Sequence, residues 1–150
     1  MSSFVAFVVE GLSIALPLDR VVRSVRAVAV IPLPQAPEVV CGIVNLQGDI
    51  VPVVNLRRRF GLTERELDLG DRFLIVRSSR RTLAMIVDTV AGVIECEEKD
   101  FVTVESIVTG TNYVEGVVKS PDGMVLIQDL DSFLPLNEEI LLDVALTSIA

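Results

Sequence analysis

Residues 42–56 decide the fold of this chain, because they contain two short apolar runs on either side of a turn. From Gly42 to Leu56 they read Gly-Ile-Val-Asn-Leu-Gln-Gly-Asp-Ile-Val-Pro-Val-Val-Asn-Leu. Both runs are rich in β-branched residues, which favour strands. Between them, Gln47-Gly48-Asp49 tolerates the backbone angles of a tight turn. The stretch therefore predicts two strands joined by a tight turn.

The second half of the chain repeats this pattern. Gly42, Gly48 and Leu56 are matched by Gly116, Gly123 and Leu130, and in both stretches the final Leu lies 14 positions after the first Gly. Upstream, Ile14–Val21 aligns with Leu83–Val90. This self-similarity indicates a duplicated unit of about 70 residues, and a closed barrel of that size leaves few exposed strand edges. We therefore expect an all-β fold of two side-by-side barrels, although aliphatic strands also resemble one another by chance.

The other apolar residues also come in short β-branched runs, bounded by Gly, Pro, Asn, Asp or Ser. The predicted strands cover residues 4–9, 12–16, 28–31, 43–46, 50–56, 73–76, 83–87, 93–96, 102–104, 113–118 and 124–127. Many short strands at close spacing are typical of a sandwich or barrel. We place the first barrel at about residues 12–70 and the second at 71–132, within a single domain of residues 1–150.

Two segments have the apolar periodicity of a helix. In residues 17–25, Pro17 can open the first turn, and apolar residues recur at i, i+3, i+4 and i+7, although this segment also fits a strand that runs into a short turn. At residues 137–149, Asn137 can cap a C-terminal helix whose first turn contains two glutamates. The apolar face expected of this helix consists of Ile140, Leu141, Val144, Ala145 and Ile149.

The composition excludes several classes of function. The 150 residues contain no histidine, which removes Ser-His-Asp and Cys-His nucleophile systems and histidine-ligated zinc. Thirteen basic against 21 acidic residues give a net charge of −8, which argues against binding to nucleic acid. Cys41 and Cys96 lie among aliphatic residues and are interpreted as small buried hydrophobes. No phosphate-binding, dinucleotide-binding or hydrolase motif is present, so we expect no cofactor and no metal.

Two charged clusters are candidate sites. The densest acidic cluster consists of Glu95, Glu97, Glu98 and Asp100, with Glu105 nearby, but Lys99 lies inside it and no glycine sets a tight ligand loop. We interpret it as a solvated loop and keep a carboxylate-dependent small enzyme only as a remote alternative. The run Arg57-Arg58-Arg59 follows a strand, where it can bind an acidic partner or keep a strand end soluble.

A binding protein is what remains, with two candidate contact regions. The first is an apolar patch near the junction of the barrels, which we expect to be formed by Leu18, Val21, Val22, Val87 and Val90. A core role for the same residues stays open. The second is the turn Asn45, Leu46, Gln47 and Gly48, because loops on a rigid scaffold often carry binding residues.

The stretch from Pro37 to Gly61 resembles the signature of the CheW family, which reads roughly G-x-x-N-L-R-G-x-x-x-P-V-[VI]-[DN]-L-R-x-x-F-G. The resemblance continues through Ile14–Leu18, Ala84–Asp88, Gly116–Val118 and Leu141–Asp143, and it covers nearly the whole chain. It implies two side-by-side five-stranded SH3-like β-barrels with a C-terminal helix. It also implies a non-catalytic adaptor that couples the cytoplasmic tips of chemoreceptors to the regulatory domain of a CheA-type histidine kinase.

The resemblance further implies which residues make these contacts. The receptor hairpin is expected in the groove between the barrels, against Leu18, Val21 and Val90. The kinase is expected to contact the barrel ends, and the turn Asn45–Gly48, with Arg57, is expected near the junction of both partners. Two positions depart from the family pattern, because Gln47 replaces the usual Arg and Arg23 stands where many members have an acidic residue. Both suggest a partner surface of different charge.

The expected location is the cytoplasm, with recruitment to membrane-associated receptor arrays and no insertion into the membrane. The N-terminal segment has no basic region before its first apolar run, and no uncharged apolar stretch of about 18 residues occurs. An adaptor of a parallel pathway, such as motility or second-messenger control, has the same scaffold chemistry and stays open.

Overall fold

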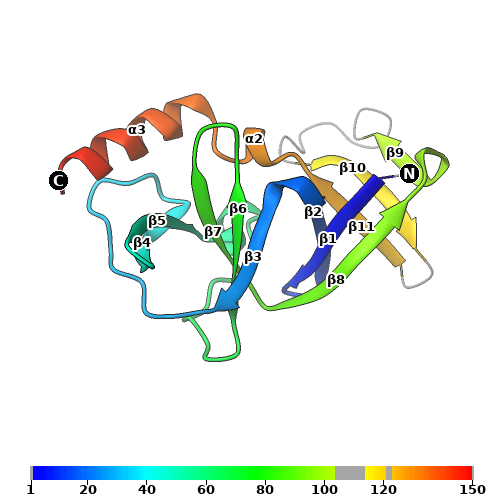
Figure 1. The fold of residues 1–150 in the computed structure, drawn as a ribbon, viewed down its shortest axis with the longest axis horizontal. Coiled ribbons are helices and arrows are strands. Elements are labelled where there is room, and N and C mark those ends of the chain that lie inside the picture. Colours follow the sequence, from blue (N-terminus) through cyan, green and yellow to red (C-terminus); the bar gives the residue numbers. More distant parts are fainter. Residues whose placement is uncertain (1, 104–113, 121–122, 150) are drawn as a thin grey trace.

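Two β-sheets lie side by side, and helices cover one end (Figure 1). The computed structural model describes residues 2–103, 114–120 and 123–149. The five-stranded sheet has the strand order β3-β6-β7-β5-β4. Its strands are β3 (Val21–Arg26), β4 (Val40–Leu46), β5 (Asp49–Val54), β6 (Arg72–Arg77) and β7 (Thr82–Val87). The six-stranded sheet has the order β8-β1-β2-β11-β10-β9. Its strands are β1 (Ser2–Val9), β2 (Leu12–Pro17), β8 (Thr89–Cys96), β9 (Phe101–Thr103), β10 (Val114–Ser120) and β11 (Gly123–Gln128).

The helices are short, except for the last one. Two 3-10 turns, η1 (Leu18–Arg20) and η2 (Glu98–Asp100), link consecutive strands. Two single-turn helices, α1 (Leu56–Arg59) and α2 (Leu130–Phe133), follow β5 and β11, and the C-terminal helix is α3 (Leu136–Thr147). Asn55 and Asp129 cap α1 and α2 through their side-chain oxygens, which accept backbone N–H groups of the first turn.

The two sheets have the same topology, as the duplication requires. The two strand orders coincide when β8-β1-β2-β11-β10 of one sheet is matched, strand by strand, with β3-β6-β7-β5-β4 of the other. Strand β9 is then the extra strand. The parallel pairing between β5 and β7 places Val53 opposite Ala84, and the pairing between β11 and β2 places Ile127 opposite Ala15. These are the positions that the sequence alignment of the two units makes equivalent. The repeat is therefore visible in the register as well as in the residues.

The glycines that begin each repeat are required by close packing. A Cβ atom on Gly42 would lie 2.2 Å from the carbonyl oxygen of Ile31, and one on Gly116 would lie 2.8 Å from that of Val102. In each unit a neighbouring segment crosses directly over the glycine, and only a residue without a side chain fits there. The isolated bridge between Ile31 and Ile43 is thus the counterpart of the pairing between β9 and β10.

The expected fold class of two SH3-like units with a C-terminal helix is confirmed, with differences in detail. One sheet has six strands instead of five. The units also do not divide at residue 70, because β6 and β7 complete the first sheet while β1 and β2 belong to the second. Each unit of sequence thus donates a hairpin to the other sheet. Residues 28–31 form only the isolated bridge, and Val104 and Tyr113, at the ends of two predicted strands, lie outside the described residues.

The helix proposed for residues 17–25 is wrong. Only Leu18–Arg20 form a 3-10 turn, and the following residues form strand β3. Here tertiary pairing with β6 and the β-branched valines of this segment outweigh the apolar periodicity. The strand alternative that the sequence left open is the correct one.

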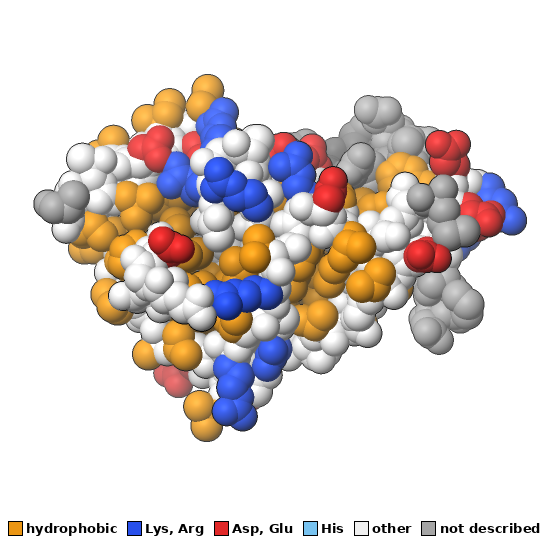
Figure 2. All heavy atoms as spheres, viewed as in Figure 1, with side chains coloured by type: hydrophobic (Ala, Val, Ile, Leu, Met, Phe, Trp, Pro, Cys, Tyr) orange, Lys and Arg blue, Asp and Glu red, His pale blue; other side chains and the backbone are white. Residues whose placement is uncertain are grey.

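The predicted apolar face of the C-terminal helix is wrong except for Ala145, which is buried. The helix begins at Leu136 with Pro135 at the N-cap, so Asn137 lies in its first turn. It buries Glu139, Leu142 and Ala145, whereas Ile140, Leu141, Val144 and Ile149 are exposed. Apolar side chains are accordingly visible over α3 in Figure 2. The reason is Arg81, whose Nε lies 3.1 Å from a carboxylate oxygen of Glu139 and neutralises the buried acid.

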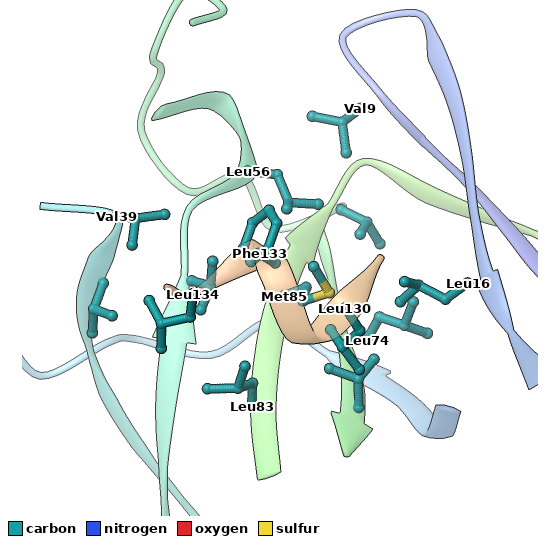
Figure 3. Close-up of a cluster of buried hydrophobic side chains, with 14 of the residues drawn as sticks. Val9, Leu16, Val39, Leu56, Leu74, Leu83, Met85, Leu130, Phe133 and Leu134 are labelled. Carbon is teal, nitrogen blue, oxygen red and sulfur yellow. The ribbon is translucent and has the colours of Figure 1, made fainter. Parts of the chain in front are cut away.

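The largest core cluster lies between the sheets and under the helices (Figure 3). Leu16 comes from the six-stranded sheet, Leu74 and Met85 from the five-stranded sheet, and Phe133 and Leu142 from α2 and α3. All five side chains are at most 1% exposed. Full burial of one such side chain stabilises the fold by about 1.5–3 kcal/mol, so this shared core holds the two sheets together as one body.

Candidate functional site

Leu18 and Val22 present apolar surface where the chain passes from one sheet to the other. Leu18 in η1 is 42% exposed and Val22 in β3 is 59% exposed, whereas Val21 between them packs partly on the shared core. Val22 protrudes because it is the extra residue of a β-bulge, since the register between β3 and β6 shifts between Val21 and Arg23. Leu18 also borders a surface groove of about 560 Å³ that Phe4 and Phe101 help to line.

The other two residues of the predicted patch lie elsewhere. Val87 is fully buried in the core, so its prediction as a contact residue is wrong. Val21 of β3 is opposite Val76 of β6, which in turn is opposite Leu83 of β7. Val87 lies four residues beyond Leu83, about 13 Å further along β7. Val90 is half-buried against the core and pairs with Phe7. The structure therefore brings Leu18, Val21 and Val22 together but does not add Val87 to them.

The turn Asn45–Gly48 closes the hairpin between β4 and β5. Leu46 pairs with Asp49, and the two residues between them, Gln47 and Gly48, have positive φ angles of 53° and 93°. This is the geometry of a type I′ turn. The side-chain oxygen of Asn45 accepts the backbone N–H of Gly48 at 2.8 Å, which fixes the turn. Gln47 is exposed at its tip, so its amide is available to a partner.

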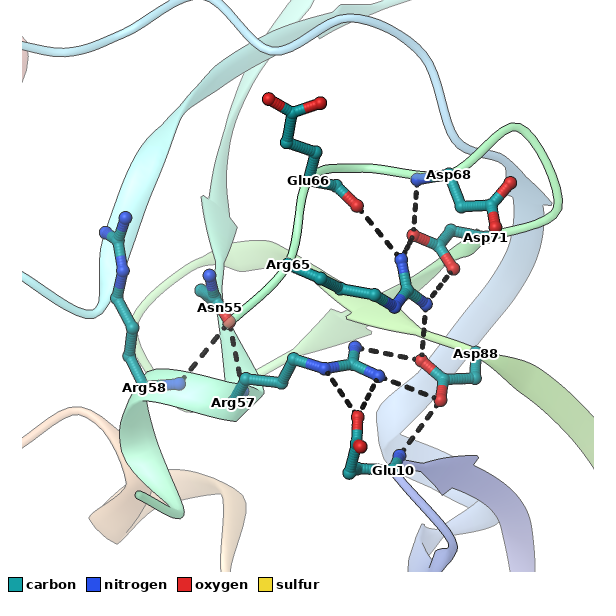
Figure 4. A network of polar contacts seen from close by, with 9 residues as sticks. All are labelled: Glu10, Asn55, Arg57, Arg58, Arg65, Glu66, Asp68, Asp71 and Asp88. Atoms are coloured by element: carbon teal, nitrogen blue, oxygen red, sulfur yellow. Dashed lines mark hydrogen bonds and ion pairs between the residues drawn. The ribbon is translucent and has the colours of Figure 1, made fainter. Parts of the chain in front are cut away.

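Arg57 lies far from that turn, at the opposite end of β5, inside a network of charges (Figure 4). Its side chain is only 6% exposed. The guanidinium donates to Glu10 at 2.8 and 3.2 Å and to both carboxylate oxygens of Asp88 at 2.9 and 3.0 Å. Asp88 stands where the chain crosses from β7 to β8, and Glu10 lies in the turn between β1 and β2. Arg57 thus joins the two sheets and does not extend the predicted loop site.

The network continues into the segment between α1 and β6. Arg65 donates to Asp71 at 2.6 Å and 2.8 Å and to Asp88 at 3.0 Å. Burial raises the pKa of the Asp88 carboxyl, but hydrogen bonds from Arg57 and the N–H of Glu10, and the charges of Arg57 and Arg65, hold that pKa below its ordinary value. Burial likewise raises the pKa of Asp71, and its bonds with Arg65 and the N–H of Asp68 outweigh that effect and lower it. Both carboxylates are therefore ionised and bound at neutral pH.

The other two arginines of the run are also bound within the molecule. Arg58 contacts Glu64 at 2.5 Å and the carbonyl oxygen of Glu38 at 2.7 Å. Arg59 is paired with Glu138 of α3 and lies over the ring of Phe133, 5.5 Å from its centroid. The expectation that this run binds an acidic partner is not supported, because these side chains form the internal joints of α1.

Comparisons with known proteins agree with this architecture. The family model described as the CheW-like domain matches residues 3–138. The chain belongs to the CheW family. The chemotaxis protein CheW of Treponema pallidum is 33% identical over 113 residues, which cover 71% of this chain and 66% of that protein. The CheW of Helicobacter pylori is 26% identical over 132 residues, which cover 87% and 80%. The crystal structure of the scaffolding protein TtCheW from Thermoanaerobacter tengcongensis superposes with a TM-score of 0.82 at 31% identity and covers 91% of this chain and 94% of that one.

Membership in the CheW family defines the class of function. The chain is accordingly a non-catalytic scaffold protein of chemotaxis. In the described ranges, no group of three or more acidic or cysteine side chains is arranged to hold a metal ion. Within the acidic cluster near residue 97, Glu97 pairs with Lys99 at 3.2 Å on the surface. No helix in the described part of the chain is long and apolar enough to cross a membrane.

Sequence reasoning missed the partners of Arg57 in this CheW-family fold. Glu10 and Arg65 had no motif of their own, and they approach Arg57 and Asp88 only because the sheets exchange hairpins. Asp88 did carry a signal, since it occupies the repeat position equivalent to Asp19. The ion pairs of Asp88 with Arg57 and Arg65 give it a structural role.

Proposed function

We propose that this scaffold binds the cytoplasmic tip of a chemoreceptor against Leu18, Val21 and Val22 and a CheA-type regulatory domain through the ends of its barrels. The exposure of Val22 is the main support for this receptor-binding surface. A valine that is 59% exposed on a β-bulge has no role in the core, and it lies next to a second exposed apolar residue, Leu18. An apolar contact of three residues fits a modest interface, one that buries about 1,000 Å² or less.

The mechanism of such a scaffold is positional. The shared core and the network of Arg57 make the two sheets one body, so a partner bound at one surface is held at a defined angle to a partner bound at another. The receptor then shifts the kinase between active and inactive populations through its differential contacts with the two states. The array supplies avidity to contacts that are individually weak. The proposed place of action is the cytoplasmic side of membrane-associated receptor arrays.

The turn Asn45–Gly48 is the second proposed contact. Gln47 is exposed at its tip, and Ile50, directly opposite Asn45 in the register, is a 52% exposed apolar residue. A polar tip with an apolar side chain behind it fits an interface core with a polar rim. We assign this end of the five-stranded sheet to the contact between the kinase and the receptor.

A matched pair of variants tests the receptor surface. Val22→Glu should reduce the capture of a purified receptor-tip fragment at least tenfold, because it places a charge in an apolar contact. Val144→Glu is the control, since Val144 is equally exposed, at 59%, but lies on α3. Binding of the CheA regulatory domain and the unfolding midpoint are measured alongside. Equal receptor binding by both variants would contradict the assignment.

A further inference from the structure

The charge of this acidic protein is unevenly distributed along the chain. Residues 18–88, which form the five-stranded sheet and its loops, contain eleven arginines and eight acidic residues. The rest of the chain contains two lysines and thirteen acidic residues. A protein with a net charge of −8 therefore has one part that is net positive, and every arginine is in that part.

Most of these arginines are neutralised internally, but four on neighbouring strands are not. Within the described ranges, Arg57, Arg58, Arg59, Arg65 and Arg81 all form ion pairs. In the same ranges, no ion pair involves Arg23 and Arg26 of β3 or Arg72 and Arg77 of β6. We call these four residues the arginine edge.

The arginine edge contains an arrangement that the fold alone disfavours. Arg26 stands directly opposite Arg72 in the antiparallel register of β3 and β6. Like charges in directly opposed positions destabilise a sheet. The only hydrogen bond that the described residues offer to the Arg72 side chain is from its Nε to the hydroxyl oxygen of Ser24, 3.1 Å away, which does not neutralise the charge. The two cations therefore have no structural reason to stand together, whereas an acidic partner supplies one.

The edge is accessible and continuous with the proposed receptor surface. Strand β3 is the outermost strand of its sheet, and the side chains of Arg23, Arg26 and Arg77 are exposed. Arg23 follows Val22 directly in the chain. Figure 2 shows Lys and Arg side chains gathered over β3 and the β6–β7 hairpin, with apolar side chains beside them over β1 and β8. A partner that covers Val22 would thus meet Arg23 at the margin of the contact, whereas Arg26 and Arg72 lie further along the two strands and on the opposite face of the sheet.

We propose that the arginine edge binds carboxylate side chains of the receptor tip, so that this scaffold takes a receptor whose contact surface is acidic. The proposal rests on the receptor surface proposed above. The apolar residues hold the receptor, and guanidinium groups, which bind carboxylates in a planar two-point geometry, select its charge. Arg23 thereby gains a role in partner selection, as its departure from the family pattern suggests. The complementary fields also accelerate encounter in a manner that salt suppresses.

Charge reversal at the edge tests this inference. The double variant Arg23→Glu/Arg26→Glu is compared with Lys119→Glu, which reverses an exposed cation of β10 that also has no ion pair among the described residues. Binding of a receptor-tip fragment is measured by calorimetry at about 50 and 500 mM NaCl. We expect the double variant to bind roughly 10–100-fold more weakly at low salt and to lose the salt dependence of the unmodified protein. The control variant should stay within about twofold.

The outcomes separate the two proposals. If the unmodified protein does not bind the fragment, the proposed receptor surface and the inference both fail. If it binds, and the double variant and Lys119→Glu bind equally well, the receptor surface stands and the inference is overturned. Replacement of the receptor's acidic contact residues by lysine should restore binding to the double variant. If instead the edge binds a single-stranded oligonucleotide and reversal leaves receptor affinity unchanged, the arginines serve nucleic acid and the inference is likewise overturned.

Discussion

The two repeats end their central strands in the same way but connect the sheets with opposite charges. After β5, Asn55 caps α1, and Arg57 supplies the positive charge of ion pairs with Glu10 and Asp88. After β11, Asp129 caps α2 and the equivalent residue, Asp131, reaches Arg20 at 3.4 Å and the N–H of Ser79 at 2.8 Å from the negative side. Arg57 of the first joint is buried and contacts Asp88 with two-point geometry, whereas the ion pair of the second joint, between Arg20 and Asp131, is exposed and longer. One duplicated position has thus become a strong joint in one copy and a weak one in the other.

Arg59 and Phe133 occupy equivalent positions in the two repeats, and substitutions at these positions should differ most in their effect on the unfolding free energy. Phe133 is fully buried, and Arg59 lies over its ring. Phe133→Ala should lower the free energy of unfolding by about 3–5 kcal/mol through the cavity it leaves. Arg59→Ala should cost less, about 1–2 kcal/mol, since it leaves the largely buried carboxylate of Glu138 without that cation. Urea unfolding followed by circular dichroism measures both, and a larger loss for Arg59→Ala would reverse our ranking of the two positions.

Substitution at the charged joint of the first repeat, Arg57, should also lower the unfolding free energy differently from substitution at that of the second, Asp131. Arg57→Ala leaves Asp88 and Glu10 facing each other without their cation, and we expect a loss of about 2–3 kcal/mol in unfolding free energy. Asp131→Asn removes an exposed ion pair with a long N–O distance of 3.4 Å, so its loss should stay below about 1 kcal/mol. Similar losses from the two substitutions would mean that burial does not distinguish the joints.

Acid should weaken the strong joint. Asp88 and Asp71 have pKa values below their ordinary range in the fold, so the unfolded chain binds protons more readily than the folded chain as the pH falls. Their contribution is complete above the unfolded value of about 3.9 and is lost as the pH falls through the lower folded values. Arg57→Ala removes two of the four hydrogen bonds that Asp88 accepts from the described residues. The unfolding free energy measured between pH 6 and pH 3 should therefore fall less steeply for this variant than for the unmodified protein. An unchanged slope would assign the acid sensitivity to other carboxylates.

The smallest effect is expected at the arginine edge, and it has the opposite sign. Arg26→Glu replaces a pair of like charges with an ion pair opposite Arg72, so it should stabilise the fold by a few tenths to about 1 kcal/mol. The six-stranded sheet offers the comparison Lys119→Glu, which should be neutral within about 0.5 kcal/mol. Destabilisation by Arg26→Glu would show that the two arginines are not in conflict.

The sequence was sufficient for the fold because the repeat pattern is local. Hairpin turns and β-branched runs each depend on a few neighbouring residues. The interleaving of the sheets was not predictable in the same way. It depends on the parallel pairings of β5 with β7 and of β11 with β2, which join residues about 30 and 110 positions apart.

The candidate site was predictable only where exposure follows from local geometry. Gln47 at a tight turn was expected on the surface and is exposed there. Val22 and Val87 have similar sequence surroundings, but a β-bulge exposes the first and the shared core encloses the second. Which face of α3 is buried depends on the contact between Glu139 and Arg81 in the turn between β6 and β7, 58 positions away, which no periodicity within the helix encodes.

The exchange of hairpins between the sheets has an evolutionary consequence. Because β1 and β2 complete one sheet and β6 and β7 the other, deleting either copy of the ancestral unit would leave both barrels open, with unpaired edges that aggregate. Once the two copies had swapped strands, neither could be discarded, and mutations such as the opposite joints at Arg57 and Asp131 could accumulate in each copy separately. The asymmetry that gives an adaptor two different faces is thus a product of a duplication that became irreversible.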